Sequence, residues 1–375
     1  MRVLVCPDKF RGTLSAPRAA EAIARGWGRA RPDDHVRLMP LADGGEGTLD
    51  VLMSDAGPSL AGSRRVARSV TGPDGDPVDA DAGVRGGTGV VEMARASGLQ
   101  LLTPARRDPC RTTTRGTGEL MAALLDEGID RLLVGLGGSA TNDGGSGMAR
   151  ALGIRFLDAA GEAIREGGAA LLGLARIDAR GIDPRLAAVD CVGLTDVDNP
   201  LCGPTGASAT FGPQKGASPE DVWDLDHALG HLAAVAYRDL GFDLQHEPGA
   251  GAAGGLGFGL LAFCGASLRS GVEAVMEAVG FDDELREADL VITGEGTLDE
   301  QSLRGKVPAG VMRAAELRRV PVAIVCGAAQ VHPEGIAVRS LVDRVGLDRA
   351  LADTRRSVEL VAEELARDVA RGVTP

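Results

Sequence analysis

The stretch DLVITGEGTLD, residues 289–299, runs from apolar residues directly into glycines and carboxylates. Its first half, Asp289 to Thr293, predicts a buried strand, because a short apolar run bounded by turn residues is typical of a parallel sheet. A helix over 308–318, a strand over 321–326 and a last helix around 358–369 are predicted to follow. This alternation predicts a parallel sheet with helices on its faces.

The N-terminal residues show the same alternation. Val3 to Cys6 is a short apolar run, and Ser15 offers an N-cap before Pro17 and an amphipathic helix that reaches Trp27. A second strand is predicted over 36–39, and DGGEG, residues 43–47, opens another helix. We therefore expect the two ends of the chain to share one parallel sheet.

The pattern changes between the two ends. Three short apolar runs lie within 64–93, separated by turn-rich segments, and further strands are predicted over 131–136 and 190–194. A helix is predicted over 219–237. We expect an α/β protein in which 1–62 and 267–375 form one domain, and 63–266 form an inserted second α/β domain with a mixed sheet.

Composition narrows the class of protein. The chain has 375 residues, 54 of them glycine, and only 3% are aromatic, so we expect many sharp turns and close ligand approaches. A net charge of −13 with no basic block argues against nucleic-acid binding. No signal peptide or membrane span is predicted, and six cysteines without a CxxC pair indicate reduced thiols. We expect a soluble cytoplasmic protein.

Five glycine-flanked segments place carboxylates, amides or lysines after predicted strands, where open parallel sheets bind ligands. They are residues 8–12, 41–47, 137–145, 195–201 and 293–299. One such segment is usually only a turn, since Gly, Asp and Asn favour turn conformations. Five of them in one chain indicate a site, because bare glycine amides can approach phosphates and carboxylates can hold Mg²⁺ through its waters.

The rarity and the positions of lysine also indicate a phosphate-binding site. The chain has 40 basic residues, of which only Lys9, Lys215 and Lys306 are lysines, and all three lie beside glycine-rich segments. A compact ammonium and a guanidinium fork are not interchangeable at a phosphate, so we regard the three lysines as candidate phosphate contacts. Chance placement is the alternative, because glycine is abundant throughout the chain.

The sequence contains partial matches to two nucleotide-binding fingerprints. Gly305-Lys306 precedes a predicted helix, but Val307 follows it and Glu300 stands where a P-loop needs glycine, so the chain is not a P-loop protein. Residues 249–254 match GxGxxG, although Pro248 precedes them where a strand should end. Dinucleotide binding therefore stays open as an alternative.

The glycine-flanked segments resemble the glycerate kinase family, specifically its bacterial type I group, over nearly the whole chain. The matching segments are PDKFRG at 7–12, PLADGGEG at 40–47, GTGEL at 116–120, GGSATNDGG at 137–145, DVDNPLCG at 196–203 with FGPQKGA at 211–217, GAGAAGG at 249–255, and 293–306. One departure is Arg11, where the family often has lysine. So many motifs in one order make the resemblance specific.

The resemblance implies two α/β domains, one of them Rossmann-like, with the active site in the cleft between them. It also implies a kinase that uses ATP and Mg²⁺ to phosphorylate D-glycerate, with neither a nucleic-acid nor a membrane partner, as a monomer or homodimer. The 2-hydroxyl, giving 2-phosphoglycerate, is favoured over the 3-hydroxyl because the resembling enzymes mostly phosphorylate that position.

Residue types and the family pattern together suggest roles for the candidate site residues. Asp196 is the candidate base or orienter of the attacking hydroxyl, while Lys306 and Lys215 would neutralise phosphate oxygens. Asp43 and Glu295 are candidates for Mg²⁺ or its waters. The residues expected to bind glycerate are Asp8, Lys9, Arg11, Asp198 and Asn199. Those expected to approach the nucleotide are Gly137, Gly138, Ser139, Asn142, Asp143, Gly251, Gly254, Gly255 and Glu295.

Two other functions remain compatible with the sequence. The first is an NAD(P)-dependent hydroxy-acid oxidoreductase, suggested by the GxGxxG match. The second is a non-catalytic sugar-acid-binding protein, because a fold alone does not fix a function.

Overall fold

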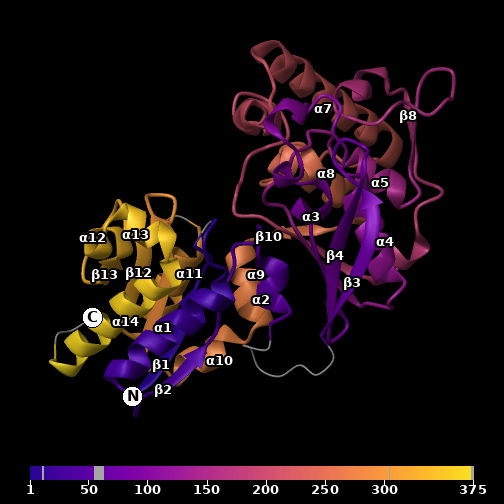
Figure 1. The fold of residues 1–375 in the computed structure, drawn as a ribbon. Coiled ribbons are helices and arrows are strands. Elements are labelled where there is room, and N and C mark those ends of the chain that lie inside the picture. The colour runs from indigo at the N-terminus through magenta and orange to yellow at the C-terminus, as the bar shows by residue number, and fades with distance from the viewer. Residues whose placement is uncertain (11, 55–62, 304, 373–375) are drawn as a thin grey trace. The chain divides into compact units, whose positions relative to one another are not determined.

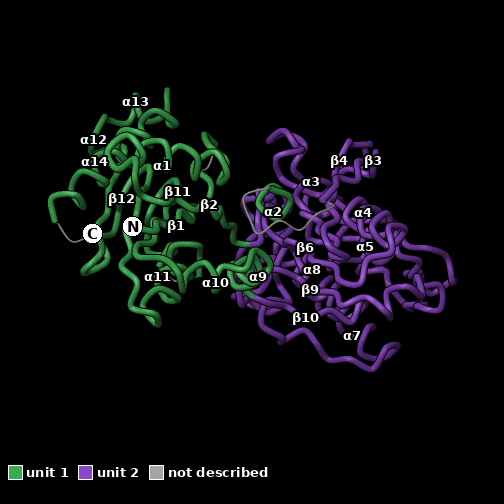
Figure 2. The backbone as a smooth tube through the Cα atoms, turned by 90° about the horizontal axis from the view of Figure 1, so that it is seen from below, with its two compact units in different colours: residues 1–43, 50–60, 270–375 green, residues 44–49, 61–269 purple. Residues whose placement is uncertain are grey.

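The computed structural model describes residues 1–10, 12–54, 63–303 and 305–372 (Figure 1). The chain forms two compact units, shown in different colours in Figure 2. Unit 1 contains residues 1–43, 50–60 and 270–375, and unit 2 contains residues 44–49 and 61–269. Residues 44–49 thus belong with unit 2, whereas we expected them in the domain that begins at residue 1.

Unit 1 is built on a five-stranded sheet in the order β13-β12-β11-β1-β2, in which every neighbouring pair is parallel. Its strands are β1 (Arg2–Pro7), β2 (His35–Leu38), β11 (Leu290–Leu298), β12 (Val322–Ala329) and β13 (Ala337–Ser340). Strands from the two ends of the chain pair directly, since Val3 lies opposite Leu290. The predicted shared parallel sheet is confirmed.

Helices cover both faces of this sheet, which explains why its strands are apolar without alternation. On one face Val3 and Val5 pack with α1 (Ala16–Ala30) and α14 (Thr354–Ala370). On the other face Ile324 packs against Met312 of α11 (Val307–Arg318). The helix α2 (Thr48–Leu52) begins in the unit 2 segment 44–49 and ends in unit 1. The remaining helices of unit 1 are α9 (Gly271–Ala278), α10 (Phe281–Arg286), α12 (Leu341–Val345) and α13 (Leu347–Ala352).

The winding of the unit 1 sheet reverses between β1 and β11. From β1 the chain passes through α1 to β2 on one side, while β11, β12 and β13 follow one another on the other side. Open α/β sheets bind ligands at such a switch point, just beyond the carboxyl ends of the strands. The fold therefore indicates a ligand site around residues 8 and 295.

Unit 2 contains a six-stranded mixed sheet in the order β10-β9-β6-β5-β4-β3. The strands β10, β9, β6 and β5 are parallel, whereas β4 pairs antiparallel with both β5 and β3. The expected mixed sheet is therefore present. The strands of unit 2, including the separate pair β7 and β8, are β3 (Arg64–Thr71), β4 (Pro77–Arg85), β5 (Thr88–Glu92), β6 (Arg131–Gly135), β7 (Arg155–Leu157), β8 (Arg176–Asp178), β9 (Asp190–Leu194) and β10 (Ser267–Arg269).

Helices and short 3-10 turns cover this second sheet. The α-helices are α3 (Ala94–Ser97), α4 (Arg115–Leu125), α5 (Ser146–Ala151), α6 (Ala207–Phe211), α7 (Pro219–Leu240) and α8 (Ala252–Cys264). The 3-10 helices are η1 (Leu99–Leu101), η2 (Pro104–Arg106), η3 (Ala169–Gly173), η4 (Pro184–Ala188) and η5 (Pro213–Lys215). The N-terminus of α7 is stabilised by a capping box that Ser218 and Asp221 form.

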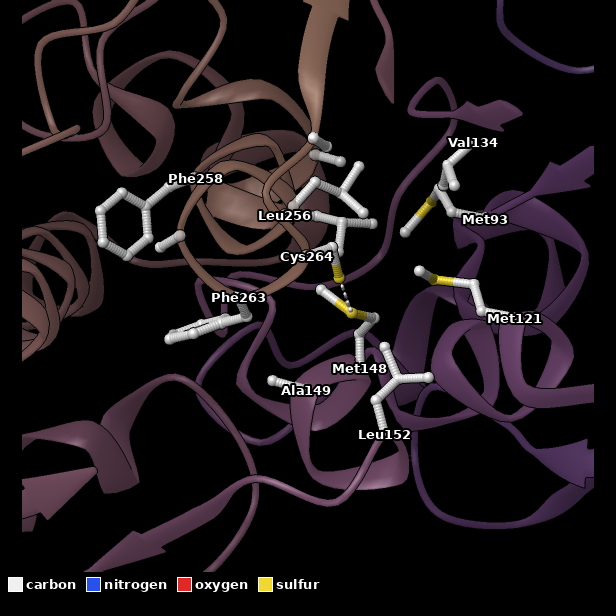
Figure 3. Close-up of a cluster of buried hydrophobic side chains, with 14 of the residues drawn as sticks. Met93, Met121, Val134, Met148, Ala149, Leu152, Leu256, Phe258, Phe263 and Cys264 are labelled. Atoms are coloured by element: carbon white, nitrogen blue, oxygen red, sulfur yellow. Dashed lines mark hydrogen bonds between the residues drawn. The ribbon is translucent and has the colours of Figure 1, made fainter. Parts of the chain in front are cut away.

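The core of unit 2 is filled mainly by small, aliphatic and sulfur-containing side chains, as the low aromatic content suggests (Figure 3). Met121 and Met148 are fully buried, and the Cys264 thiol lies 3.7 Å from the Met148 sulfur. Phe156 and Phe263 meet edge to face with ring centroids 5.5 Å apart. All six cysteines of the chain are free thiols. Among the described helices, none has the length and apolar character needed to cross a bilayer.

The contact between α1 and α14 provides a test of the unit 1 core. A Cβ added at Gly26 of α1 would lie 2.1 Å from the Glu359 carbonyl oxygen, whereas one added at Gly28 would meet nothing within 4 Å. We expect Gly26→Ala to lose about 1–3 kcal/mol of stability through overpacking. Gly28→Ala, on the same helix, should gain about 0.5–1 kcal/mol from helix propensity. Thermal unfolding followed by circular dichroism measures both, and equal effects would contradict the packing.

Candidate active site

Three acidic side chains of unit 1 lie around the switch point of its sheet. Asp8 follows β1, Asp43 follows β2, and Glu295 lies in the last part of β11. Asp8 and Glu295 are only 5% and 6% exposed. The Asp8 amide is held by the Gly294 carbonyl at 2.8 Å, which keeps the end of β1 against β11.

Burial makes the Asp8 and Glu295 carboxylates weaker acids than usual. It raises the pKa of Asp8 to about 7, and the neighbouring charges of Asp43 and Glu295 raise it further, while Lys9 lowers it. Burial also raises the pKa of Glu295 to about 7, against the lowering effect of Ser302 and Lys306. The acids therefore share one local field, and added positive charge would favour their ionised forms.

The carboxylates of this site fit a cation that keeps its waters better than a cation that side chains bind directly. Glu295 Oε1 is buried and accepts no hydrogen bond from the described residues. However, no group of three or more His, Cys, Asp or Glu side chains within the described ranges is arranged to hold a metal directly. Mg²⁺ commonly keeps several waters and is held by one or two carboxylates together with substrate phosphates. Asp43 and Glu295 are compatible with that mode of binding.

Two lysines accompany the acidic group. The Lys9 amide donates to Asp8 Oδ1 at 2.6 Å. Lys306 is the N-cap residue of α11, where its side chain is 31% exposed and its Nζ lies 3.9 Å from Asp299 Oδ1. A helix N-terminus favours anions, so an ammonium at this position adds to an existing preference. Arg11, the third cation predicted here, lies outside the described residues.

In unit 2 the loop after β6 carries the predicted nucleotide contacts Gly137, Gly138 and Ser139. Gly138 has a φ of +78°, and its carbonyl accepts the Leu99 amide at 2.9 Å, which ties the loop to η1. Ser139 is 9% exposed. Glycine is required at residue 137, because a Cβ there would lie 2.6 Å from the Gly45 Cα.

Asp143 fixes the second half of this loop. Its carboxylate accepts the Thr114 amide and hydroxyl at 2.9 Å each, and the amides of Gly145 and Gly147 at 3.1 Å each. Complete burial still raises its pKa, although all of these bonds lower it. The Asp143 side chain is thus committed to holding the starts of α4 and α5.

Asn142 is the neighbouring predicted contact. Its Nδ2 donates to Ser208 Oγ at 2.9 Å, whereas its Oδ1 is buried and accepts nothing from the described residues. The Thr141 hydroxyl is likewise buried without a described partner. Unsatisfied buried polar atoms are costly, so this pair marks a place where a bound group would bring donors.

Lys215 lies inside unit 2 rather than on its surface. It is 1% exposed, and its Nζ donates to the Thr141 carbonyl at 2.8 Å. Burial lowers its pKa to about 7, which the charge of Asp143 partly opposes. The residue therefore holds the 137–145 loop, and its predicted contact with a phosphate stays a prediction.

The segment 249–255 packs against two other predicted segments. A Cβ added at Gly254 would lie 1.9 Å from the Thr141 carbonyl oxygen, and one added at Gly251 would lie 2.2 Å from the Pro200 carbonyl oxygen. Ala253 and Gly255 adopt positive φ values of +54° and +86°. A left-handed alanine is uncommon and often marks a functional segment. The structure thus brings the segments 137–145, 195–201 and 249–255 together.

The segment after β9 carries the remaining predicted residues. Asp196 and Asp198 are exposed at the carboxyl end of that strand. Asn199 donates through Nδ2 to the Thr205 carbonyl at 2.7 Å, and its own carbonyl accepts the Gly251 amide at 2.9 Å. Asn199 is therefore mainly occupied in shaping the loop, and Asp196 is exposed.

Residues 249–254 do not form a dinucleotide fingerprint, although their sequence matches one. They follow a turn rather than a strand, and α8 begins within them. The fingerprint requires a strand immediately before its first glycine, so that the pyrophosphate meets the helix N-terminus at the end of a sheet. This geometry does not support the oxidoreductase alternative.

Comparison with known proteins decides the family. The Glycerate kinase family profile matches residues 3–370. A glycerate kinase of Bacillus subtilis (strain 168) is 47% identical over 378 residues, covering 98% of both chains. A glycerate 2-kinase of Escherichia coli (strain K12) is 43% identical, covering 100% of this chain and 99% of that one.

The chain belongs to the glycerate kinase family. A crystal structure from Salmonella typhimurium LT2, assigned as a glycerate kinase 2, matches it with a TM-score of 0.88 and 43% identity over 99% of each chain. The family predicted from the motifs is confirmed, and so is the α/β fold. The predicted active site in a cleft between the domains stays a prediction.

From the sequence of this family member we missed Glu92, which the structure places at the carboxyl end of β5. Its carboxylate is 2% exposed and accepts the Leu49 amide at 2.6 Å and Arg95 Nε at 3.0 Å. It thereby holds the segment 44–49, which follows Asp43 directly in the chain. A glutamate that ends an otherwise apolar strand was the available signal.

The buried lysine of this glycerate kinase family member gives a pH test. Because its pKa of about 7 in the folded chain lies below the ordinary 10.5, the unfolded chain binds more protons between those values. Its contribution to the free energy of unfolding therefore rises with pH across that window. We expect the wild type to gain about 5 °C in Tm relative to Lys215→Met between pH 6.5 and pH 9.5. A difference between the two proteins that stays constant with pH would contradict the burial of this ammonium.

Proposed function

We propose that this protein transfers the γ-phosphate of ATP to the 2-hydroxyl of D-glycerate, giving 2-phosphoglycerate. The observation that carries the proposal is the buried acidic group at the switch point of the unit 1 sheet, with the Lys306 ammonium at the N-cap of α11. It occurs in a chain that aligns over its whole length with glycerate kinases. Six free thiols agree with a cytoplasmic location, which we also propose.

Phosphoryl transfer needs positioning and charge neutralisation, because negative charge gathers on the transferred group and on the leaving oxygen. Mg²⁺, when bound with the nucleotide, supplies positive charge to the phosphate oxygens. Asp43 and Glu295 would hold it through its waters, and the unsatisfied Glu295 Oε1 suits an acceptor of water hydrogen bonds. Lys306 would add an ammonium at a helix end that already favours anions.

The attacking hydroxyl needs a group that accepts its proton or orients it. We assign this role to Asp196, because it is an exposed aspartate just beyond the carboxyl end of β9, and its neighbours Thr195 and Val197 lie close to Gly249. Lys9, with Arg11, would hold the glycerate carboxylate through their positive charges. The amides of Gly137 to Ser139 would approach the nucleotide, on a loop that Asp143 and Lys215 keep in place.

The alternatives drawn from the sequence have less support. An oxidoreductase would need the strand-to-glycine geometry that residues 249–254 lack. A non-catalytic binding protein would have no use for buried acids whose ionisation depends on added positive charge. Neither class is represented by the relatives named above, which are kinases.

Incubation of the purified protein with ATP, Mg²⁺ and D-glycerate tests the proposal. We expect ADP release that requires all three components, and a ³¹P NMR doublet that matches authentic 2-phosphoglycerate. A product that matches 3-phosphoglycerate would overturn the regiochemistry and leave the kinase activity intact. Absence of ADP release from folded protein would overturn the function itself.

The assignment of Asp196 has its own test. We expect Asp196→Asn to lower kcat by about 10²- to 10⁴-fold, the range typical of a lost general base, with a smaller effect on the KM for ATP. Asp190→Asn is the matched control, because Asp190 is an exposed aspartate at the opposite end of the same strand. Near-normal turnover of a correctly folded Asp196→Asn protein would remove the role.

A further inference from the structure

The solvent face of α7 and the loop after it carry exposed aromatic side chains, in a chain with few aromatic residues. The chain has two tryptophans and one tyrosine. Trp223 is 63% exposed and Tyr237 is 60% exposed, both on α7, and Phe242, two residues beyond its end, is 54% exposed. Exposed large aromatic residues are enriched at protein interfaces, where they supply most of the contact energy.

Trp223 and Tyr237 belong to one continuous stripe on this helix. The stripe consists of Trp223, His227, Gly230, Ala234 and Tyr237, which are exposed or half-buried. Their spacings of four, three, four and three residues place them on one face of a helix. The opposite face is buried against unit 2 through Leu225, Leu229 and Leu232. Figures 1 and 2 both place α7 at the periphery of unit 2.

The first aromatic residue of the stripe is held in position. The Trp223 and His227 rings stack with centroids 3.7 Å apart, and His227 Nδ1 lies 3.0 Å from the Trp223 carbonyl oxygen. A side chain fixed in advance loses less conformational entropy on binding than a free one. The tryptophan is therefore suited to an interface.

The two halves of the stripe are complementary about Gly230. Trp223 lies seven residues before it and Tyr237 seven residues after it, with the small Ala234 on one side opposing His227 on the other. A two-fold axis through Gly230 would place an identical helix antiparallel to this one. Trp223 would then face Tyr237 of the second copy, and His227 would face its Ala234. Such a self-complementary patch is what an isologous dimer requires.

Charge along α7 favours the same antiparallel arrangement. The first part of the helix carries four acidic residues, Glu220, Asp221, Asp224 and Asp226. The basic residue of its last turn is Arg238, whose side chain remains 56% exposed although it also bonds Asp239. The antiparallel pairing sets this arginine beside the acidic start of the second helix, and it also opposes the two helix dipoles.

We propose that the α7 stripe is the interface of a homodimer in which two copies of α7 pack antiparallel about Gly230. The stripe spans fifteen residues, 223–237, or about 21 Å of helix. A helix face of that length, extended by the exposed Leu172 of η3 and by Phe242, stays below the roughly 800 Å² per partner of a standard stable interface. The dimer is therefore weak and concentration-dependent. It is independent of the catalytic proposal.

Sedimentation velocity at about 1 to 100 μM tests self-association; we expect the mean mass to rise from 38.4 kDa toward twice that value. Ala234→Glu adds bulk and negative charge at an exposed position that would face the acidic half of the second helix, and should weaken association at least about tenfold. Leu347→Glu, at an exposed leucine of α13 in unit 1, is the matched control and should leave it unchanged.

Disulfide cross-linking tests the geometry. The double variant His227→Cys, Ala234→Cys should give a covalent dimer on mild oxidation, whereas each single variant should not. In the antiparallel pairing, identical positions lie about 9 to 12 Å apart along the axis, beyond the reach of a disulfide. Wild-type protein controls for the native cysteines, and circular dichroism confirms folding of each variant.

The outcomes separate the possible occupants of the stripe. Concentration-dependent association that Ala234→Glu weakens, with cross-linking of the double variant alone, supports the proposal. A monomer at every concentration overturns it and leaves the stripe to a different protein. If Ala234→Glu does not weaken association, the interface lies on another face. Efficient cross-linking of the single variants would indicate parallel helices. Either result overturns the proposal.

Discussion

The burial of two carboxylates at the carboxyl ends of adjacent parallel strands is the constraint on which the unit 1 site depends. Asp8 and Glu295 cannot move away from each other, because β1 and β11 are hydrogen-bonded neighbours inside an apolar core. Their burial and the charge of Asp43 raise both pKa values to about 7, so the folded chain holds them at a cost in free energy. A site that bears such a cost is suited to binding positive charge, and we infer that this explains the acids.

Unit 2 depends on a different constraint, the close approach of backbone to backbone. A Cβ at Gly135 would lie 2.4 Å from the Gly44 carbonyl oxygen, and a Cβ at Gly254 would lie 1.9 Å from that of Thr141. Segments far apart in the sequence can touch at these points only because the residues lack side chains. The high glycine content thus has a specific use here, which is to stack three polar loops without an intervening layer of side chains.

The sequence was sufficient for four of the five strands of the unit 1 sheet and for the position of its polar segments, but it did not predict β13. Short apolar runs before Asp8, Asp43 and Glu295 predicted the strands, because a strand buried on both faces is a short apolar run. β11 continues through Glu295 to Leu298, beyond its predicted end at Thr293. The sequence was not sufficient to predict what the side chains of Asp143, Asn199 and Glu92 do. Whether such a polar residue faces a ligand or caps the backbone depends on which amide lies within about 3 Å, and that is set by tertiary packing.

The three lysines show why the scarcity of a residue type does not by itself indicate one common role. Lys215 is enclosed and has one described acceptor, the Thr141 carbonyl. A guanidinium there would bury five donors, so the compact ammonium is explained by the size of the site without any phosphate. Lys306 is partly exposed at a helix N-terminus, so burial does not explain that lysine. We propose instead that it places a point charge beside phosphate oxygens. Of these two lysines, Lys306 therefore has the stronger claim to contact the nucleotide.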